Sequence, residues 1–166
     1  MFDLQRDEAV LRQTPRVLRT TLEGLPPRWW NANYGEGTRS PREVVAHLIF
    51  GERTDWIPRA RIILEKGESA VFEPFDRGGH AALHAENSMP RLLDPFESER
   101  EANLEVLRSF ALTPAMLAKR GKHPALGPAT LSHMLSAWVV HDLNHIAQIC
   151  KALAYQHREA VGPCKQ

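Results

Sequence analysis

Residues 130–149 of this 166-residue chain read TLSHMLSAWVVHDLNHIAQI, and this stretch decides the fold. Its apolar residues, among them Trp138 and Ile149, recur at the spacing that places them on one face of an α-helix. Thr130 is a suitable N-cap, because its hydroxyl can accept a hydrogen bond from the first turn of the helix. The pattern predicts a long helix over residues 131–156.

The stretch SPREVVAHL, which begins at Ser40, contains the clearest helix start in the chain. Ser40 is placed as the N-cap, Pro41 occupies the first helical position, and Glu43 follows the cap by three residues, which makes a capping box. We expect this helix to run to about Lys66, where Gly67 is a natural stop.

Helices are also predicted over residues 2–25 and 94–112. The first contains Pro15, which should kink or split it because proline lacks an amide donor. The second begins at Asp94 with a start of the same kind as the capping box above. Residues 121–128 are expected to be a loop. Four helices without an alternating strand pattern predict an all-α four-helix bundle.

Length and charge limit the classes of protein to which the chain can belong. A single domain over residues 1–166 is long enough to bury roughly 70% of the surface that its unfolded form exposes. The 21 Lys and Arg residues nearly balance the 20 Asp and Glu residues, so a net charge of +1 provides no basic field for nucleic acid. No apolar run approaches the roughly 20 residues of a membrane span. We therefore expect neither nucleic acid nor a membrane as a partner.

The two cysteines, Cys150 and Cys164, are too few for a disulfide framework. The start of the chain mixes charges and lacks the apolar core of a signal peptide. Both observations predict a cytoplasmic protein. Cys150 is expected to be a small buried residue of the last helix.

Three of the 8 histidines can converge on one point. His141 and His145 stand four residues apart, so on a helix they are separated by about 40° of rotation and 6 Å of rise. His47 flanks the apolar stripe of the facing helix, and bundle proteins build metal sites from inward side chains on facing helices. We predict that these three residues bind a divalent metal ion. The alternative, which the four-residue spacing alone favours, is that each is an ordinary half-buried histidine.

The remaining histidines are less well placed. His133 lies about 80° and 12 Å from His141 on the same helix, which takes it away from the cluster. His80 and His84 fall within the long connection between the second and third helices, residues 67–93, and are expected to be solvated. A connection of this length is either functional or mobile.

Carboxylates share the histidine faces of both helices. Asp142 and Asp55 could each accept the second ring N–H of a metal-bound histidine, which would fix its orientation. Each could instead pair with an arginine such as Arg59 or Arg61, since buried carboxylates need partners. Glu52 lies about 140° round the helix from His47 and reaches the site only with a favourable tilt.

Two blocks of the sequence resemble the DinB-like superfamily. One is TRSPREVVAHL followed by Gly51–Glu52, and the other runs from His123 through the helix of residues 138–149 to Tyr155 and Gly162–Pro163. The resemblance implies a four-helix bundle of up-down-down-up connectivity. It also places His47, His141 and His145 on the ligand positions of a divalent metal site, which zinc, nickel or iron would suit.

The resemblance further implies a homodimer and, in members with an assigned activity, metal-dependent transfer of a low-molecular-weight thiol to a small-molecule substrate. This sequence departs from the pattern at Cys164, where an aromatic residue is expected, and residues 67–93 show no match. Two alternatives to the transferase remain. One is a metal-dependent hydrolase, which needs a general base from Glu52, Asp55 or Asp142. The other is a non-catalytic metal-binding homodimer associated with stress.

Overall fold

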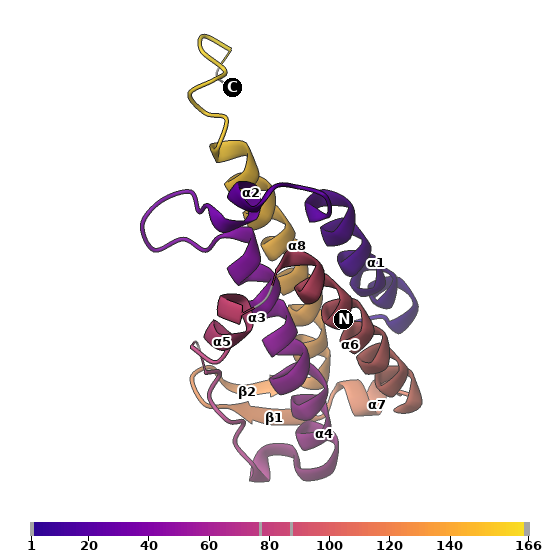
Figure 1. Cartoon of the computed structure of the whole chain (residues 1–166). Coiled ribbons are helices and arrows are strands. Elements are labelled where there is room, and N and C mark those ends of the chain that lie inside the picture. Colours follow the sequence, from indigo (N-terminus) through magenta and orange to yellow (C-terminus); the bar gives the residue numbers. More distant parts are fainter. Residues whose placement is uncertain (1, 77, 87, 165–166) are drawn as a thin grey trace.

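Four long helical segments pack against one another along the molecule (Figure 1). They are α1 (Leu4–Leu22), the consecutive pair α3 (Pro41–Thr54) and α4 (Trp56–Lys66), α6 (Met89–Ser109) and α8 (Leu131–Tyr155). The shorter elements are α2 (Pro27–Asn31), η1 (Gly67–Ser69), α5 (Ala81–Glu86), α7 (Pro114–Leu117), β1 (Arg120–His123) and β2 (Gly127–Thr130). The computed structural model describes residues 2–76, 78–86 and 88–164.

The four segments have up-down-down-up directions. In Figure 1, α1 rises to α2 at the top, α3 and α4 descend, α6 descends to α7, and α8 rises to the C-terminus. Because α4 and α6 point the same way, the chain between them must climb back along the bundle, and this return explains the long connection that the sequence showed. The predicted four-helix bundle is confirmed.

Two apolar clusters fill the bundle, one toward each end. In the first, the indole rings of Trp56 and Trp138 stack with their centroids 5.6 Å apart, and Leu104 packs among them. The second contains Phe96 and Ile49. On α6, a charged residue, Arg100, lies midway between Phe96 and Leu104 and is only 1% exposed. The core is therefore divided by a buried cation.

The predicted second helix is interrupted at Asp55, so α3 and α4 are separate helices. Pro58 accounts for the break. It has no amide hydrogen to donate to the carbonyl of Thr54, and its ring would clash with that carbonyl in a continuous helix. The capping box is confirmed, because the Ser40 side chain accepts from the Glu43 amide and the Glu43 carboxylate accepts from the Ser40 amide.

The predicted split of the first helix at Pro15 is wrong, because α1 runs from Leu4 to Leu22 without interruption. Pro15 cannot donate to the carbonyl of Leu11, one turn earlier in the helix. A guanidinium nitrogen of Arg100, Nη1, donates to that carbonyl instead, at 2.6 Å. The buried arginine thus replaces the hydrogen bond that the proline removes.

Two other boundaries also differ from the prediction. The third helix begins at Met89 rather than Asp94, because Met89 and the leucines of its first turns are buried in the core. Residues 120–130 form an antiparallel hairpin, with Arg120 opposite Thr130, where the sequence suggested a loop. The last helix, by contrast, follows its prediction, and Thr130 caps it by accepting from the His133 amide at 3.1 Å.

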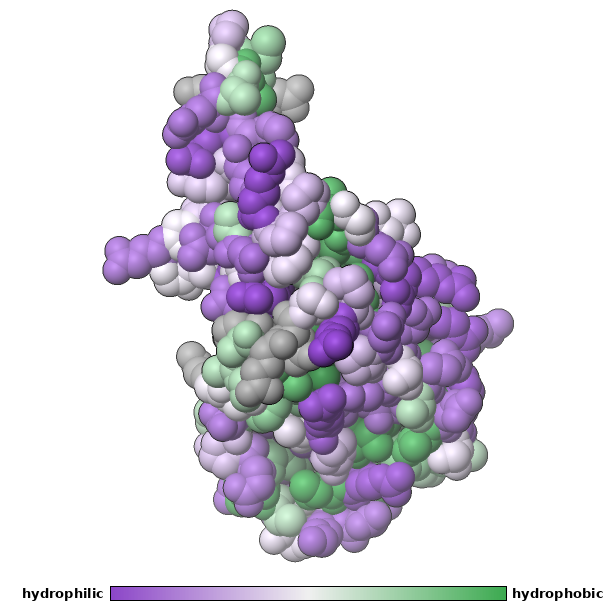
Figure 2. Space-filling model, viewed as in Figure 1, coloured by the Kyte–Doolittle hydropathy of each residue, from purple (hydrophilic) through white to green (hydrophobic). Residues whose placement is uncertain are grey.

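Hydrophilic side chains cover most of the face shown in Figure 2. Within the part of the chain that the structure describes, none of the helices combines the length and the apolar character needed to cross a membrane.

Candidate metal centre

The three histidines that the sequence singled out meet between α3 and α8. The Nε2 atom of His141 lies 3.1 Å from Nε2 of His47 and 3.1 Å from Nε2 of His145. Within the described residues, these three form the one group of His, Cys, Asp or Glu side chains whose ligand atoms all fall within 4.8 Å of one another. The structure therefore brings together the predicted ring nitrogens.

The spacing of these nitrogens suits a shared cation. Zn–N bonds of 2.0–2.1 Å in tetrahedral geometry place neighbouring ligand nitrogens about 3.3 Å apart, close to the spacing found here. The orientation of the His145 ring is also fixed on the side away from the cluster, because its Nδ1 lies 2.8 Å from Oε1 of Gln148. If Nδ1 donates to that oxygen, the lone pair is left on Nε2, where the rings converge.

Burial keeps two of the rings neutral. Burial, helped by the neighbouring histidines, lowers the pKa of His47 to about 2 and the pKa of His145 to about 4. Neutral imidazole is the form that binds metals, since the protonated ring has no lone pair to offer. Near neutral pH, both rings are therefore in the form that a metal needs.

With a chelator present, the protein is expected to lose stability as the pH falls from about 6.5 toward 4. An unfolded histidine has a pKa of about 6.5. Below that pH the unfolded chain therefore binds protons at these two histidines, whereas folded His47 and His145, with their lowered pKa values, remain unprotonated. Each unit by which a folded pKa is lowered contributes about 1.4 kcal/mol to this loss. Melting temperatures measured from pH 7 to pH 4 should fall more steeply for the wild type than for His145→Gln. Parallel curves would contradict the assignment.

An open pocket of about 360 Å³ lies over the cluster. It is lined by Arg39, His47, Asp55, Phe75, His141 and His145. The ring of Phe75 packs edge-on against His47 with centroids 5.2 Å apart. The site is therefore partly polar and accessible to a small molecule, rather than sealed by apolar side chains.

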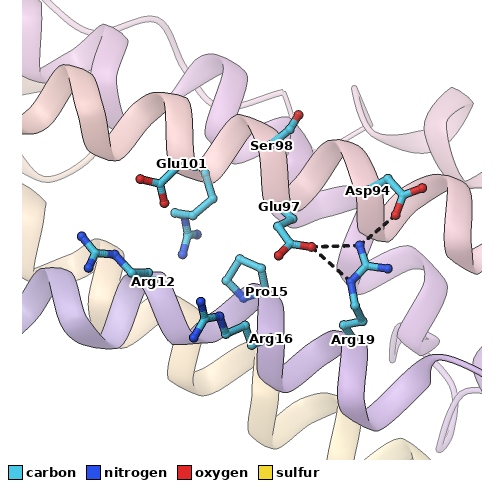
Figure 3. Close-up of a pocket in the computed structure, with 9 residues that line it drawn as sticks. Arg12, Pro15, Arg16, Arg19, Asp94, Glu97, Ser98 and Glu101 are labelled. Atoms are coloured by element: carbon cyan, nitrogen blue, oxygen red, sulfur yellow. Dashed lines mark hydrogen bonds and ion pairs between the residues drawn. The ribbon is translucent and has the colours of Figure 1, made fainter.

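Figure 3 shows a different pocket, of about 410 Å³, between α1 and α6. On one side of it, Arg19 of α1 bridges Asp94 at 2.8 Å and Glu97 at 2.9 Å, both on α6. It contains no histidine or cysteine. These ion pairs link α1 to α6.

Asp142 and Glu52 pair with a buried arginine rather than with the histidines. Nη1 of Arg100 lies 2.6 Å from Oδ2 of Asp142, and Nη2 lies 2.7 Å from Oε1 of Glu52. Oδ1 of Asp142 is 4.0 Å from Nδ1 of His141, which is too long for a hydrogen bond. The pairing interpretation was correct for Asp142, but its partner is not Arg59 or Arg61.

Asp55 behaves differently from these two carboxylates. Nη2 of Arg59 lies 2.8 Å from Oδ1 of Asp55. This ion pair agrees with the prediction that Asp55 pairs with an arginine. Burial raises its pKa, while Arg59 opposes the rise. Of the three acidic residues that the sequence nominated, Asp55 is the one that lines the pocket.

The sequence did not lead us to expect Arg100 as the partner of these carboxylates, although its position on the helix indicated that it is buried. It stands four residues after Phe96 and four before Leu104, on the apolar stripe of α6. A charged residue on such a stripe must be paired when buried. Asn103 adds to the same network by donating to Oε2 of Glu52 at 2.9 Å.

The expectation that His80 is solvated is wrong. Its side chain is 6% exposed, and its ring centroid is 5.5 Å from that of His47. The preceding residue, Gly79, lies so close to Phe50 that a Cβ atom would sit 2.3 Å from the ring. The connection thus forms a wall of the site. The side chain of His84 lies outside the described residues. His133 is exposed on α8 and, as predicted, is not part of the cluster.

The chain resembles known proteins over most of its length. Residues 11–149 match the DinB superfamily. An inferred metal-dependent hydrolase of Oceanobacillus iheyensis is 25% identical over 140 residues, covering 84% of this chain and 79% of that protein.

Solved structures share the fold. YfiT from Bacillus subtilis, described as a probable metal-dependent hydrolase with an unusual four-helix bundle topology, matches with a TM-score of 0.77 at 22% identity, over 95% of this chain and 87% of YfiT. TT2238, a four-helix bundle protein, matches with a TM-score of 0.58 at 17% identity, over 90% of this chain and all of that one. The family match spans well over half of the residues, and the chain belongs to the DinB superfamily.

Proposed function

We propose that His47, His141 and His145 bind one divalent metal ion and that the pocket above them hydrolyses a small-molecule substrate. The observation that carries the proposal is a carboxylate, Asp55, lining the same open pocket as the three converging imidazoles. When bound, a cation held by three histidines supplies a Lewis acid that lowers the pKa of a coordinated water or thiol.

Asp55 has the properties of a general base in this arrangement. Its contact with Arg59 holds the side chain in place through Oδ1. Its raised pKa makes it a stronger base than an exposed aspartate. We infer that the carboxylate takes a proton from the attacking water.

Arg39 gives the pocket a preference for anionic substrates. Its side chain is half-buried at the pocket wall, and the described residues provide it with no ion-pair partner. A guanidinium in this position can hold a carboxylate through two parallel hydrogen bonds. We infer that the substrate is a small ester or amide that carries an anionic group.

Two relatives carry names that support hydrolysis, the Oceanobacillus iheyensis protein and YfiT. Thiol transfer is the second candidate, because the pocket has room for a small thiol next to the imidazoles. That thiol would come from solution. Both Cys150 and Cys164 are exposed and absent from the pocket wall, and the expectation of a buried Cys150 is wrong. A purely structural metal site fits an open, polar pocket less well.

The deciding experiment uses protein loaded separately with zinc, nickel and iron(II). Loaded protein is offered a panel of small esters and amides with and without a carboxylate, and parallel samples receive small thiols with an electrophile. Metal-dependent hydrolysis, faster for the anionic members, is the expected result. Thiol consumption without hydrolysis would establish transfer instead, and inactivity of every loaded form in both assays would contradict a catalytic role.

Asp55→Asn is expected to lower kcat by about 100-fold or more, the scale of contribution of a general base. Metal content should not change, because Asp55 is not one of the converging ligands. The measurement is kcat alongside elemental analysis of the same samples. Asp94→Asn is the matched control, since Asp94 lies in the pocket between α1 and α6. Equal kcat values for Asp55→Asn and wild type would rule out the assigned base.

A further inference from the structure

The ring of His47 has a buried nitrogen that the metal site leaves without a role. When Nε2 of a neutral histidine binds a metal, the ring proton is on Nδ1, and this N–H group is normally paired with an acceptor that fixes the orientation of the ring. Within the described residues, Nδ1 of His47 is buried and has no hydrogen-bond partner. A buried N–H group without an acceptor costs about 1–3 kcal/mol. A metal-bound His47 therefore needs an acceptor at Nδ1.

The other two ligands have an oxygen atom beside the corresponding nitrogen. Nδ1 of His145 lies 2.8 Å from Oε1 of Gln148. Nδ1 of His141 lies 4.0 Å from Oδ1 of Asp142, a carboxylate on the next residue of the same helix. Both acceptors belong to α8, so they do not serve the ligand that comes from α3.

Aromatic rings, rather than carboxylates, surround His47. Besides the other two ligands, the rings packed edge-on against it are those of Phe75 and His80, with centroids 5.2 Å and 5.5 Å away. Burial lowers the pKa of His47, and the neighbours that lower it most are the other two ligands, Arg39 and His80, none of which is a carboxylate. Phe75 has no nitrogen or oxygen in its side chain. Of the two packed rings, His80 is thus the one with a hydrogen-bond acceptor.

Packing of the turn on α3 sets the position of His80. Its side chain is 6% exposed. The preceding residue is Gly79, where a Cβ atom would lie 2.3 Å from the ring of Phe50 on α3, so the turn approaches the helix as closely as a glycine permits. The helix that follows directly, α5, also packs against α3 (Figure 1). The fold therefore places this imidazole beside His47 instead of leaving it in solvent.

The distance between the two rings suits a direct hydrogen bond. A ring nitrogen is about 1.2 Å from the centroid of its imidazole, so an N–H···N distance of about 3 Å places two collinear rings about 5.4 Å apart. The centroids of His47 and His80 are 5.5 Å apart. In the same cluster, His47 and His141 have centroids 5.1 Å apart and ring nitrogens 3.1 Å apart. Rotation of the rings, without movement of the backbone, is enough to form the bond.

We propose that His80 is a positioning residue of the metal site, which accepts the Nδ1 hydrogen of His47 and so holds Nε2 of that ring toward the cation. The inference rests on the proposed binding of a metal by the three histidines. It goes further by giving a role to the connection of residues 67–93, the part of the chain in which the sequence shows no match to the family.

The test compares the zinc affinity of His80→Phe and His80→Gln, measured by competition with a coloured chelator. Phenylalanine keeps an aromatic ring in the same space but offers no acceptor, whereas glutamine offers an acceptor and fills the space less well. His80→Phe should weaken zinc binding by about 10- to 100-fold, the cost of losing a residue that orients a ligand. His80→Gln should retain most of the affinity. A packing role would give the reverse order, and His133→Phe, at an exposed position of α8, is the matched control.

Cobalt(II)-loaded protein provides a readout that depends on neither affinity nor activity. The paramagnetic ion moves the ring N–H signals of its histidine ligands out of the normal proton spectrum, and their exchange in heavy water reports how well each hydrogen is held. One of these signals should shift and exchange faster in His80→Phe than in the wild type. The others should keep their positions, because their acceptors lie on α8.

The outcomes separate this inference from the metal site on which it rests. Wild-type protein that binds neither zinc nor cobalt would contradict the metal site itself. Metal binding with equal affinities and spectra for the wild type and His80→Phe would overturn the role of His80 alone, as would a greater loss of affinity in His80→Gln than in His80→Phe. Circular dichroism checks the fold of each variant, and His80→Leu, which also lacks an acceptor, replaces His80→Phe if the larger ring disturbs the helices.

Discussion

Arg100→Met is expected to lower the free energy of unfolding by about 3–5 kcal/mol, the cost of removing one partner from a buried ion pair. Arg100 is 1% exposed, and it contacts both Asp142 and Glu52, which are 0% and 2% exposed. Without the guanidinium, two buried carboxylates face each other with no cation. The carbonyl of Leu11, freed by Pro15, also loses its donor.

Urea denaturation of the variant and the wild type measures this loss. Arg19→Met is the matched control, because Arg19 bridges α1 to Asp94 and Glu97 at the surface, where such pairs contribute less than about 1 kcal/mol. The difference between Arg100→Met and wild type should shrink as the pH falls. Unpaired Asp142 and Glu52 would have pKa values above those of the unfolded chain, so the folded variant gains stability when they protonate. A pH-independent difference below 1 kcal/mol would show that the network is not structural.

The helices could be predicted because their signals are local. The capping box at Ser40, the hydroxyl of Thr130 and the apolar stripe of the last helix each act within one or two turns of the chain. The errors arose where a distant residue intervened. Pro15 does not split α1, since Arg100, 85 positions later in the sequence, donates to the buried carbonyl of Leu11 that Pro15 leaves without a donor. The residues next to Pro15 in the sequence give no indication of this distant donor.

In the candidate site, too, some features follow from local sequence and others depend on distant residues. His141 and His145 are one helical turn apart, so their convergence follows from sequence spacing, and His47 follows from its place on the facing helix. The roles of the carboxylates depend on which arginine packs between the helices. Asp142 and Asp55 looked equivalent, yet one pairs with Arg100 inside the core and the other lines the pocket. Only the three-dimensional packing separates them.

The burial of His80 could not be predicted from the sequence either. It lies in a connection without helical periodicity, and its position depends on contacts made by its neighbours. Gly79 packs directly on Phe50, and Phe75 packs against both Phe50 and His47. The length of the connection predicted only that it is either functional or mobile, whereas the direction in which it folds back is fixed by these aromatic contacts.

His141→Ala is expected to weaken metal binding by more than about 100-fold, beyond the 10- to 100-fold cost of losing a residue that merely orients a ligand. His141 is the central member of the cluster, since its Nε2 atom lies 3.1 Å from that of each of the other two. Removing it leaves His47 and His145 as two ligands where three are proposed. Metal content after dialysis and competition with a coloured chelator would measure the loss, and His133→Ala, an exposed histidine of the same helix, is the control.

The helices should survive both this substitution and chelation of the metal. The two apolar clusters do not include the three histidines. The ion pairs of Arg100 with Glu52 and Asp142 do not involve them either. Far-ultraviolet circular dichroism should therefore change little in His141→Ala, while the melting temperature gained on adding metal disappears. Equal metal affinity for His141→Ala and His133→Ala would refute the ligand assignment. Collapse of the helical signal on chelation would instead show that the cation holds α3 against α8, because a site that the bundle does not preform must be completed by the metal during folding.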